Sequence, residues 1–73
     1  MSHLLTFEIS ATGDALEVHF DRAGLEVLLG ALNRIKVGGH DHLMTPGWGG
    51  GELTEEHQSA AATVLNKVTL RRW

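Results

Sequence analysis

His40 and His42, separated by one residue, are the side chains whose type and spacing most resemble a metal-binding site. Alternate side chains of a β-strand point to the same face, so both imidazoles would lie together on one side. Imidazole nitrogens bind zinc, and His19 or His57 could supply the third ligand of a catalytic site. Such pairs also occur as solvated or hydrogen-bonded histidines, which is the interpretation we favour. We expect no metal, with a site at His40 and His42 as the alternative.

A run of glycines surrounds Trp48 shortly after the histidine pair, from Gly47 to Gly51. A phosphate-binding loop would continue into Lys and Ser or Thr, whereas Glu52 follows here and would repel phosphate. The glycines instead let the backbone turn sharply around a tryptophan, a residue type enriched at interface hot spots. The alternative is a buried core tryptophan. The residues expected to bind a partner are Trp48, Gly49, Gly50, Glu52, His40 and His42.

The remaining polar side chains form no recognisable catalytic set. The chain has no cysteine, which excludes a thiol nucleophile and a cysteine-based zinc site. The hydroxyls of Thr45, Thr54 and Ser59 fit no nucleophile-elbow pattern, and His57 lies in a stretch typical of a solvated turn. We therefore predict a protein that is not an enzyme and needs no cofactor.

A β-hairpin and a helix are predicted before the histidine pair. Apolar and polar residues alternate from Leu4 to Ser10 and again from Leu16 to Phe20, around a short turn with a glycine. A helix follows from about Asp21, whose side chain can cap it, to Val37, after which two glycines end it. Gly24 and Gly30 would allow it to approach the sheet closely. Its predicted core-facing stripe consists of Leu25, Leu28, Leu29, Leu32 and Ile35.

Two further strands are predicted after the helix. The third runs from His40 to Thr45 with Leu43 toward the core, and the fourth runs from Thr63 to Arg72, interrupted by Asn66. In the fourth strand Val64, Val68 and Leu70 share one side, and Leu65 takes the other. Residues 54–66 also allow a helix that reaches through Asn66, which stays open as the alternative.

The order ββαββ predicts an α+β fold, a single small domain over residues 1–73. We expect a four-stranded, mainly antiparallel sheet with the helix on one face. The other face would be open and mostly polar. It would carry Glu8, Glu17, His19, His40, His42, Met44, Lys67 and Arg71.

Composition narrows the class of partner. A chain of 73 residues buries only about 60% of its unfolded surface, and so thin a core is compatible with a homodimer. The net charge of −3 disfavours a nucleic-acid partner, although Arg71, Arg72 and Trp73 keep a nucleic-acid-binding domain as a second alternative.

We see no secretory signal and no apolar run that could span a membrane, so we expect a cytoplasmic protein without a membrane partner.

The stretch from His40 to Thr54 resembles the immunity protein 32 family of bacterial polymorphic toxin systems. The most specific part is His-x-His-Leu, then Thr-Pro-x-Trp-Gly-Gly, then Glu-Leu, and the similarity covers most of the chain. The resemblance implies a small α+β protein that neutralises a cognate toxin by binding it. It carries over no binding residues, so the site at Trp48 rests on the physical argument above. A metal-binding protein or metal-dependent enzyme using His40 and His42 is the alternative.

Overall fold

The computed structural model describes residues 3–73, which contain one helix and two antiparallel sheets. The elements are β1 (Leu5–Ile9), β2 (Leu16–Phe20), α1 (Arg22–Arg34), β3 (Gly39–Met44), the 3₁₀ turn η1 (Pro46–Trp48), β4 (Thr63–Val64) and β5 (Lys67–Arg72). The predicted α+β class is confirmed. The strands divide between two sheets, however, with orders β2-β1-β4 and β3-β5, instead of forming the single expected sheet.

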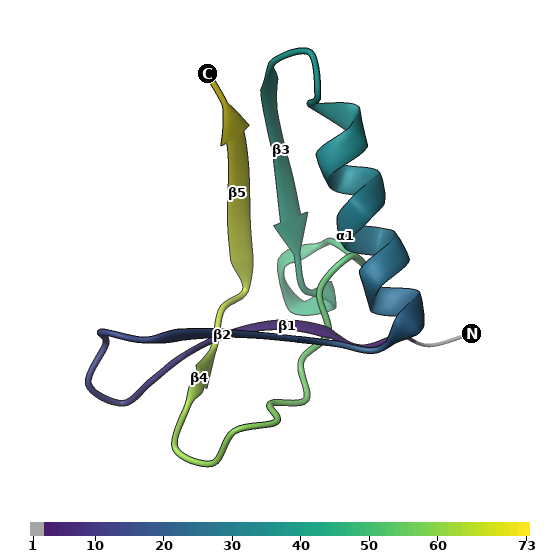
Figure 1. Cartoon of the computed structure of the whole chain (residues 1–73). Coiled ribbons are helices and arrows are strands. Elements are labelled where there is room, and N and C mark those ends of the chain that lie inside the picture. The colour runs from purple at the N-terminus through teal and green to yellow at the C-terminus, as the bar shows by residue number, and fades with distance from the viewer. Residues whose placement is uncertain (1–2) are drawn as a thin grey trace.

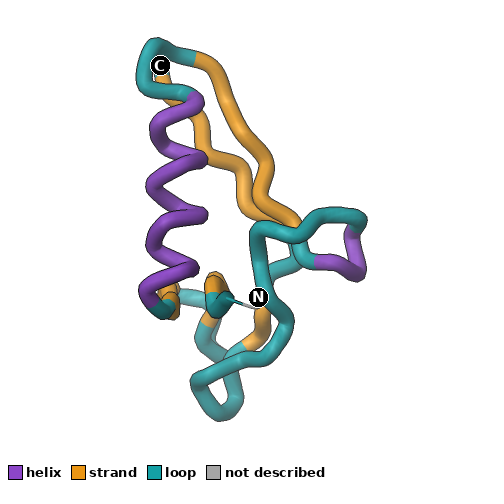
Figure 2. Tube along the Cα trace, turned by 90° about the vertical axis from the view of Figure 1, so that its right-hand side faces the viewer, coloured by secondary structure: helices purple, strands orange, loops and turns teal. Residues whose placement is uncertain are grey.

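The β1–β2 hairpin lies across the molecule, with α1, β3 and β5 on one side of it and β4 and the loop before β4 on the other (Figure 1). Seen from the side, α1 rises beside the β3–β5 sheet with the hairpin below both (Figure 2). Apolar side chains of the hairpin, of α1 and of the β3–β5 sheet meet where these three parts come together. The buried core consists of Leu5, Phe7, Ala31, Leu43 and Leu53.

One bent stretch of chain joins the two sheets. The Leu65 N–H donates to the Phe7 carbonyl (2.8 Å) beyond β4, and the Thr45 N–H donates to the Asn66 carbonyl (3.0 Å) before β5 begins. A strand that bends in this way can leave one sheet and enter another. The predicted interruption at Asn66 is confirmed, and the helical alternative is wrong. Leu65 packs against the core, contrary to prediction, because the bend shifts the alternation of side chains.

Helix α1 begins where predicted and ends early. The Asp21 carboxylate accepts hydrogen bonds from the N–H groups of Gly24 (2.7 Å) and Leu4 (3.1 Å), which confirms the cap and ties it to the chain before β1. The helix gives way to turns after Arg34, so its predicted extension to Val37 is wrong.

The buried face of α1 differs from the predicted leucine stripe. Gly24, Ala31 and Ile35 are buried, whereas Leu29 and Leu32 are 44% and 45% exposed. A Cβ atom at position 24 would lie 1.7 Å from the Leu4 carbonyl oxygen, so only glycine lets the helix approach β1 this closely. Because the helix packs on its glycine, two of the four leucines in the predicted stripe face solvent.

Candidate functional site

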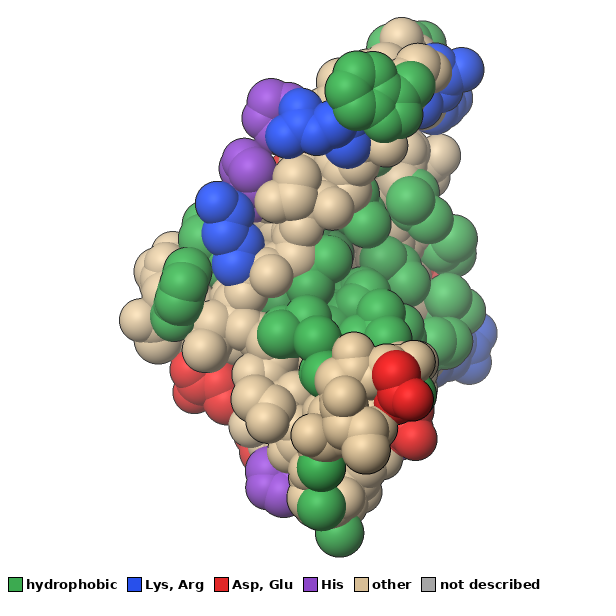
Figure 3. Space-filling model, turned by 90° about the vertical axis from the view of Figure 1, so that its left-hand side faces the viewer, with side chains coloured by type: hydrophobic (Ala, Val, Ile, Leu, Met, Phe, Trp, Pro, Cys, Tyr) green, Lys and Arg blue, Asp and Glu red, His purple; other side chains and the backbone are tan. Residues whose placement is uncertain are grey.

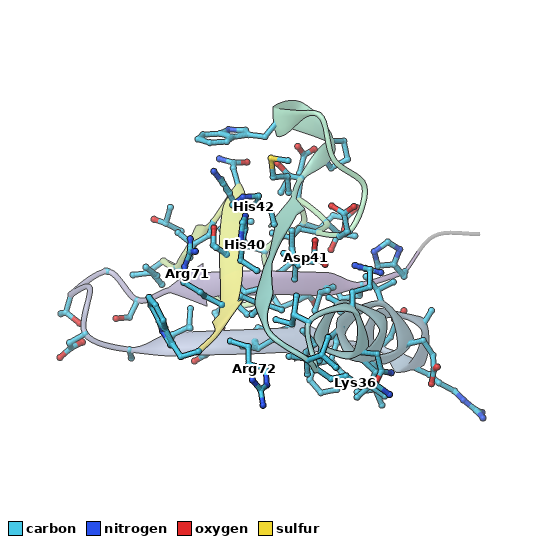
Figure 4. All side chains as sticks on the ribbon, turned by 90° about the horizontal axis from the view of Figure 1, so that it is seen from above. Lys36, His40, Asp41, His42, Arg71 and Arg72 are labelled. Atoms are coloured by element: carbon cyan, nitrogen blue, oxygen red, sulfur yellow. The ribbon has the colours of Figure 1, made fainter. Side chains whose placement is uncertain are left out.

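The outer face of the β3–β5 sheet is a polar surface that points away from α1. The antiparallel register places His40 opposite Arg71, His42 opposite Thr69, and Met44 opposite Lys67. Figure 4 shows His40, His42 and Arg71 on this side of the strands and Asp41 on the side toward the helix. Asp41 there accepts two hydrogen bonds from the Arg34 guanidinium, at 2.7 and 3.0 Å.

The two histidines of this face lie together as expected. Their ring centroids are 5.0 Å apart in an edge-on arrangement, and His42 Nδ1 lies 2.9 Å from the Thr69 hydroxyl. His19 is engaged elsewhere, 2.7 Å from Glu17 on β2, and His57 lies 3.2 Å from the Ser59 carbonyl. Among the described residues, no group of three or more His, Cys, Asp or Glu side chains could hold a metal ion.

The glycine-rich loop after β3 is fastened to the strand at several points. The Glu52 carboxylate accepts a hydrogen bond from the Met44 N–H (3.1 Å), which lowers the pKa of that carboxyl below its ordinary value. Gly50 donates its N–H to the Thr45 carbonyl (3.0 Å), and a Cβ there would lie 2.5 Å from the Met44 carbonyl oxygen. Gly49 has φ of 90°, in the left-handed region that favours glycine. Glu52, Gly49 and Gly50 thus shape the loop.

This bracing presents Trp48 to solvent. The Gly47 N–H donates to the Glu55 carboxylate (2.9 Å), and Leu53, only 1% exposed, anchors the loop in the core. Trp48 closes the short turn η1 with its side chain 58% exposed, so the alternative of a buried tryptophan is wrong. All the residues expected to bind a partner therefore belong to β3 or to the braced segment that leaves its C-terminal end.

A second loop covers the polar face of β1, which the sequence predicted to be open. Glu8 is 1% exposed because its carboxylate accepts hydrogen bonds from the N–H groups of Gln58 and Ser59, at 2.9 and 3.0 Å. Burial alone would raise the pKa of Glu8, but these bonds and one from the Thr6 hydroxyl outweigh it and lower the pKa to about 2. The prediction of Glu8 as an open-face residue is wrong. Alternation on a strand gives no sign that a distant loop covers it.

An open apolar surface lies on the side from which the β1–β2 hairpin projects. Figure 3 shows hydrophobic side chains gathered there in a broad concave area with Lys and Arg along one rim. Part of this area is a hollow between the end of α1 and β5, lined by Leu32, Ile35, Lys36, Thr69, Leu70, Arg71 and Arg72. Exposed contiguous apolar surface of this kind often marks a contact site.

Comparison with known proteins identifies a family. The family model described as Immunity protein 32 matches residues 15–68, which include β2, α1, β3, the braced loop and β4. No curated protein and no solved structure matches the chain. Within residues 3–73, the helix is too short and too polar to cross a membrane.

Proposed function

This chain belongs to the immunity protein 32 family, and on that premise we propose that it neutralises a cognate bacterial toxin by direct, non-catalytic binding. The observation that carries this proposal is Trp48, which is 58% exposed on a loop braced by hydrogen bonds. A rigid aromatic side chain loses little conformational entropy on binding and buries a large apolar area. Trp48 therefore suits the role of an anchor in a pocket of the toxin.

The outer face of β3 and β5 supplies the polar part of the proposed contact. Lys67 and Arg71 are its formally charged side chains, and His40 and His42 lie beside them. The loop carboxylates of Glu52 and Glu55 instead bond to backbone N–H groups of this chain. We therefore expect the toxin surface to carry carboxylates around the pocket for Trp48, since complementary charge speeds association and fixes orientation.

The test compares two exposed tryptophans. Trp48→Ala should keep the melting temperature and weaken toxin binding by about 2 kcal/mol or more, which is roughly 30-fold in Kd. Trp73→Ala is the matched control, because Trp73 is 96% exposed and lies beyond the far end of β5. Each variant is co-expressed with the candidate toxin, the product of the neighbouring gene, and both cell survival and the Kd are measured.

The proposed site is contradicted if folded Trp48→Ala binds the toxin and protects cells as well as the wild type does. Loss of protection by Trp73→Ala alone would place the contact at the opposite end of β5. Absence of any binding between the wild-type chain and that toxin would contradict the proposed function itself.

A further inference from the structure

Strand β2 is an edge strand whose outer side has no partner within the described residues. The Ser10 N–H donates to the Ala15 carbonyl (3.0 Å), and the Asp21 N–H donates to the Leu4 carbonyl (3.2 Å), at the two ends of the hairpin. Residues of an antiparallel pair alternate between bonded and non-bonded positions. The backbone groups of Glu17 and His19 therefore bond to β1.

The N–H and C=O groups of the alternate residues Leu16, Val18 and Phe20 consequently point outward from the sheet edge. Their side chains, on the apolar face of the hairpin, are 55%, 38% and 46% exposed. Natural edge strands usually carry a lysine, a proline or a bulge that prevents pairing with another chain. The sequence of β2 is Leu-Glu-Val-His-Phe, which contains neither lysine nor proline. It pairs with β1 in unbroken register, so the strand also contains no bulge.

We propose that β2 pairs in antiparallel fashion with β2 of a second copy of this chain, about a two-fold axis at Val18. In this register Val18 opposes Val18, and Leu16 opposes Phe20 of the second copy. These are the residues whose backbone groups point outward, so every outward N–H and C=O of the strand gains a partner. The two sheets become one continuous sheet with the order β4-β1-β2-β2-β1-β4.

The same register makes the side chains complementary on both faces. Apolar side chains meet on one face, where Leu16 of each copy lies beside Phe20 of the other. On the opposite face Glu17 of each copy lies beside His19 of the other, so acid faces imidazole and no like charges oppose each other. A shift by two residues either way would leave one outward apolar residue of each copy unpaired. The register about Val18 is therefore the self-complementary one.

The pairing also covers part of the exposed apolar surface. The two-fold axis is perpendicular to the joined sheet, so both apolar faces lie on the same side of it. Helix α1 begins at Arg22, two residues after Phe20, which opposes Leu16 of the second copy. Each helix therefore stands beside Leu16 of the other copy, a residue that is 55% exposed in a single copy. Leu29 and Leu32, exposed on α1, extend this apolar surface.

Light scattering and sedimentation of the isolated protein test the proposal without any toxin. The wild type should have a mass near twice 7.9 kDa. Val18→Lys places like charges face to face at the axis and should give a folded monomer under the same conditions. Val37→Lys makes the same change at a side chain that is 88% exposed and outside β2, and should stay dimeric. Circular dichroism checks that each variant is folded.

Crosslinking gives an independent readout, because the chain has no cysteine of its own. Val18→Cys should be joined into covalent dimers by a short bis-maleimide, whereas Val37→Cys should not. A wild type that is monomeric at its highest soluble concentration would overturn the proposal. A dimer that survives Val18→Lys unchanged, or that crosslinks at position 37 and not at 18, would also overturn it.

Discussion

Glu8 shows how one side chain can fix a loop that has no regular structure. Its carboxylate accepts the N–H groups of Gln58 and Ser59 across the covered face of β1. A buried carboxylate is stable in its charged form when several donors surround it. The stretch between Thr54 and Thr63 therefore has a fixed course although it forms neither helix nor strand.

The low pKa of Glu8 predicts that acid destabilises the fold. The ordinary pKa is 4.5 and the folded-state pKa is about 2, so the unfolded chain binds more protons between these values. Stability is then fully present above about pH 4.5 and is lost as the pH falls toward 2. Glu8→Gln should remove this component, which denaturant titrations across that pH range would measure.

The same substitution should also lower stability at neutral pH. A glutamine at position 8 offers one acceptor oxygen where the carboxylate offers two, so a buried N–H loses its partner at a cost of about 1–3 kcal/mol. Glu56→Gln is the matched control, because Glu56 is exposed. Equal acid sensitivity of the two variants would show that Glu8 does not carry the effect.

At the scale of elements, the seating of α1 depends on Gly24. Gly24→Ala should destabilise the protein by about 1–3 kcal/mol, because the added Cβ would overlap the Leu4 carbonyl and push helix and strand apart. Gly30→Ala is the matched control. Its Cβ would meet only the end of the Arg34 side chain at 3.7 Å, so it should stabilise the helix by up to about 1 kcal/mol. Melting curves of both variants measure the difference, and equal effects would contradict the close approach.

This seating explains why the helix could be predicted from the sequence and its buried face could not. The spacing of apolar residues identifies α1 and its cap at Asp21 correctly. The periodicity of apolar residues cannot show that a glycine faces the strand, because glycine has no side chain and does not count as an apolar position. Leu29 and Leu32 fit the period and still lie on the exposed side.

The braced loop could likewise be predicted only in part from the sequence. The glycines and Trp48 predict an irregular segment, and the structure places Trp48 at its surface. The bonds that shape the loop join Glu52 to Met44 and Glu55 to Gly47, each pair eight positions apart. Pairings of this kind have no periodic signature, so the sequence could not show that these two carboxylates hold the loop in place.

At the scale of the whole molecule, the division into two sheets was the part of the fold beyond prediction. Alternation identifies a strand but not its neighbour, so four strands were predicted in a single sheet, with β4 and β5 treated as one strand. The bend at Leu65 and Asn66 divides the strands into two sheets, because the chain pairs with β1 before the bend and with β3 after it. A single asparagine within an alternating stretch marks the place but not the change of sheet.

The fold should not depend on a metal ion. Its core consists of apolar side chains and its loops are held by hydrogen bonds within the chain, so EDTA should leave the circular dichroism spectrum and melting temperature unchanged. A fall in melting temperature that zinc restores would contradict this. His42→Ala would then show whether the histidine pair is the site.

Strand β1 is synthesised long before β4, yet it lies between β2 and β4 in the sheet. A chain emerging from the ribosome can form the hairpin and α1. Strand β3 cannot pair until β5 has been synthesised, and β1 cannot complete its pairing until β4 has been synthesised. Until residues 63–72 have been synthesised, the edges of β1 and β3 that later pair with β4 and β5 stay exposed to chaperones and to other chains. The two sheets can therefore be completed only after residues 63–72 have left the ribosome, and any contact that needs β3 paired with β5 depends on that step.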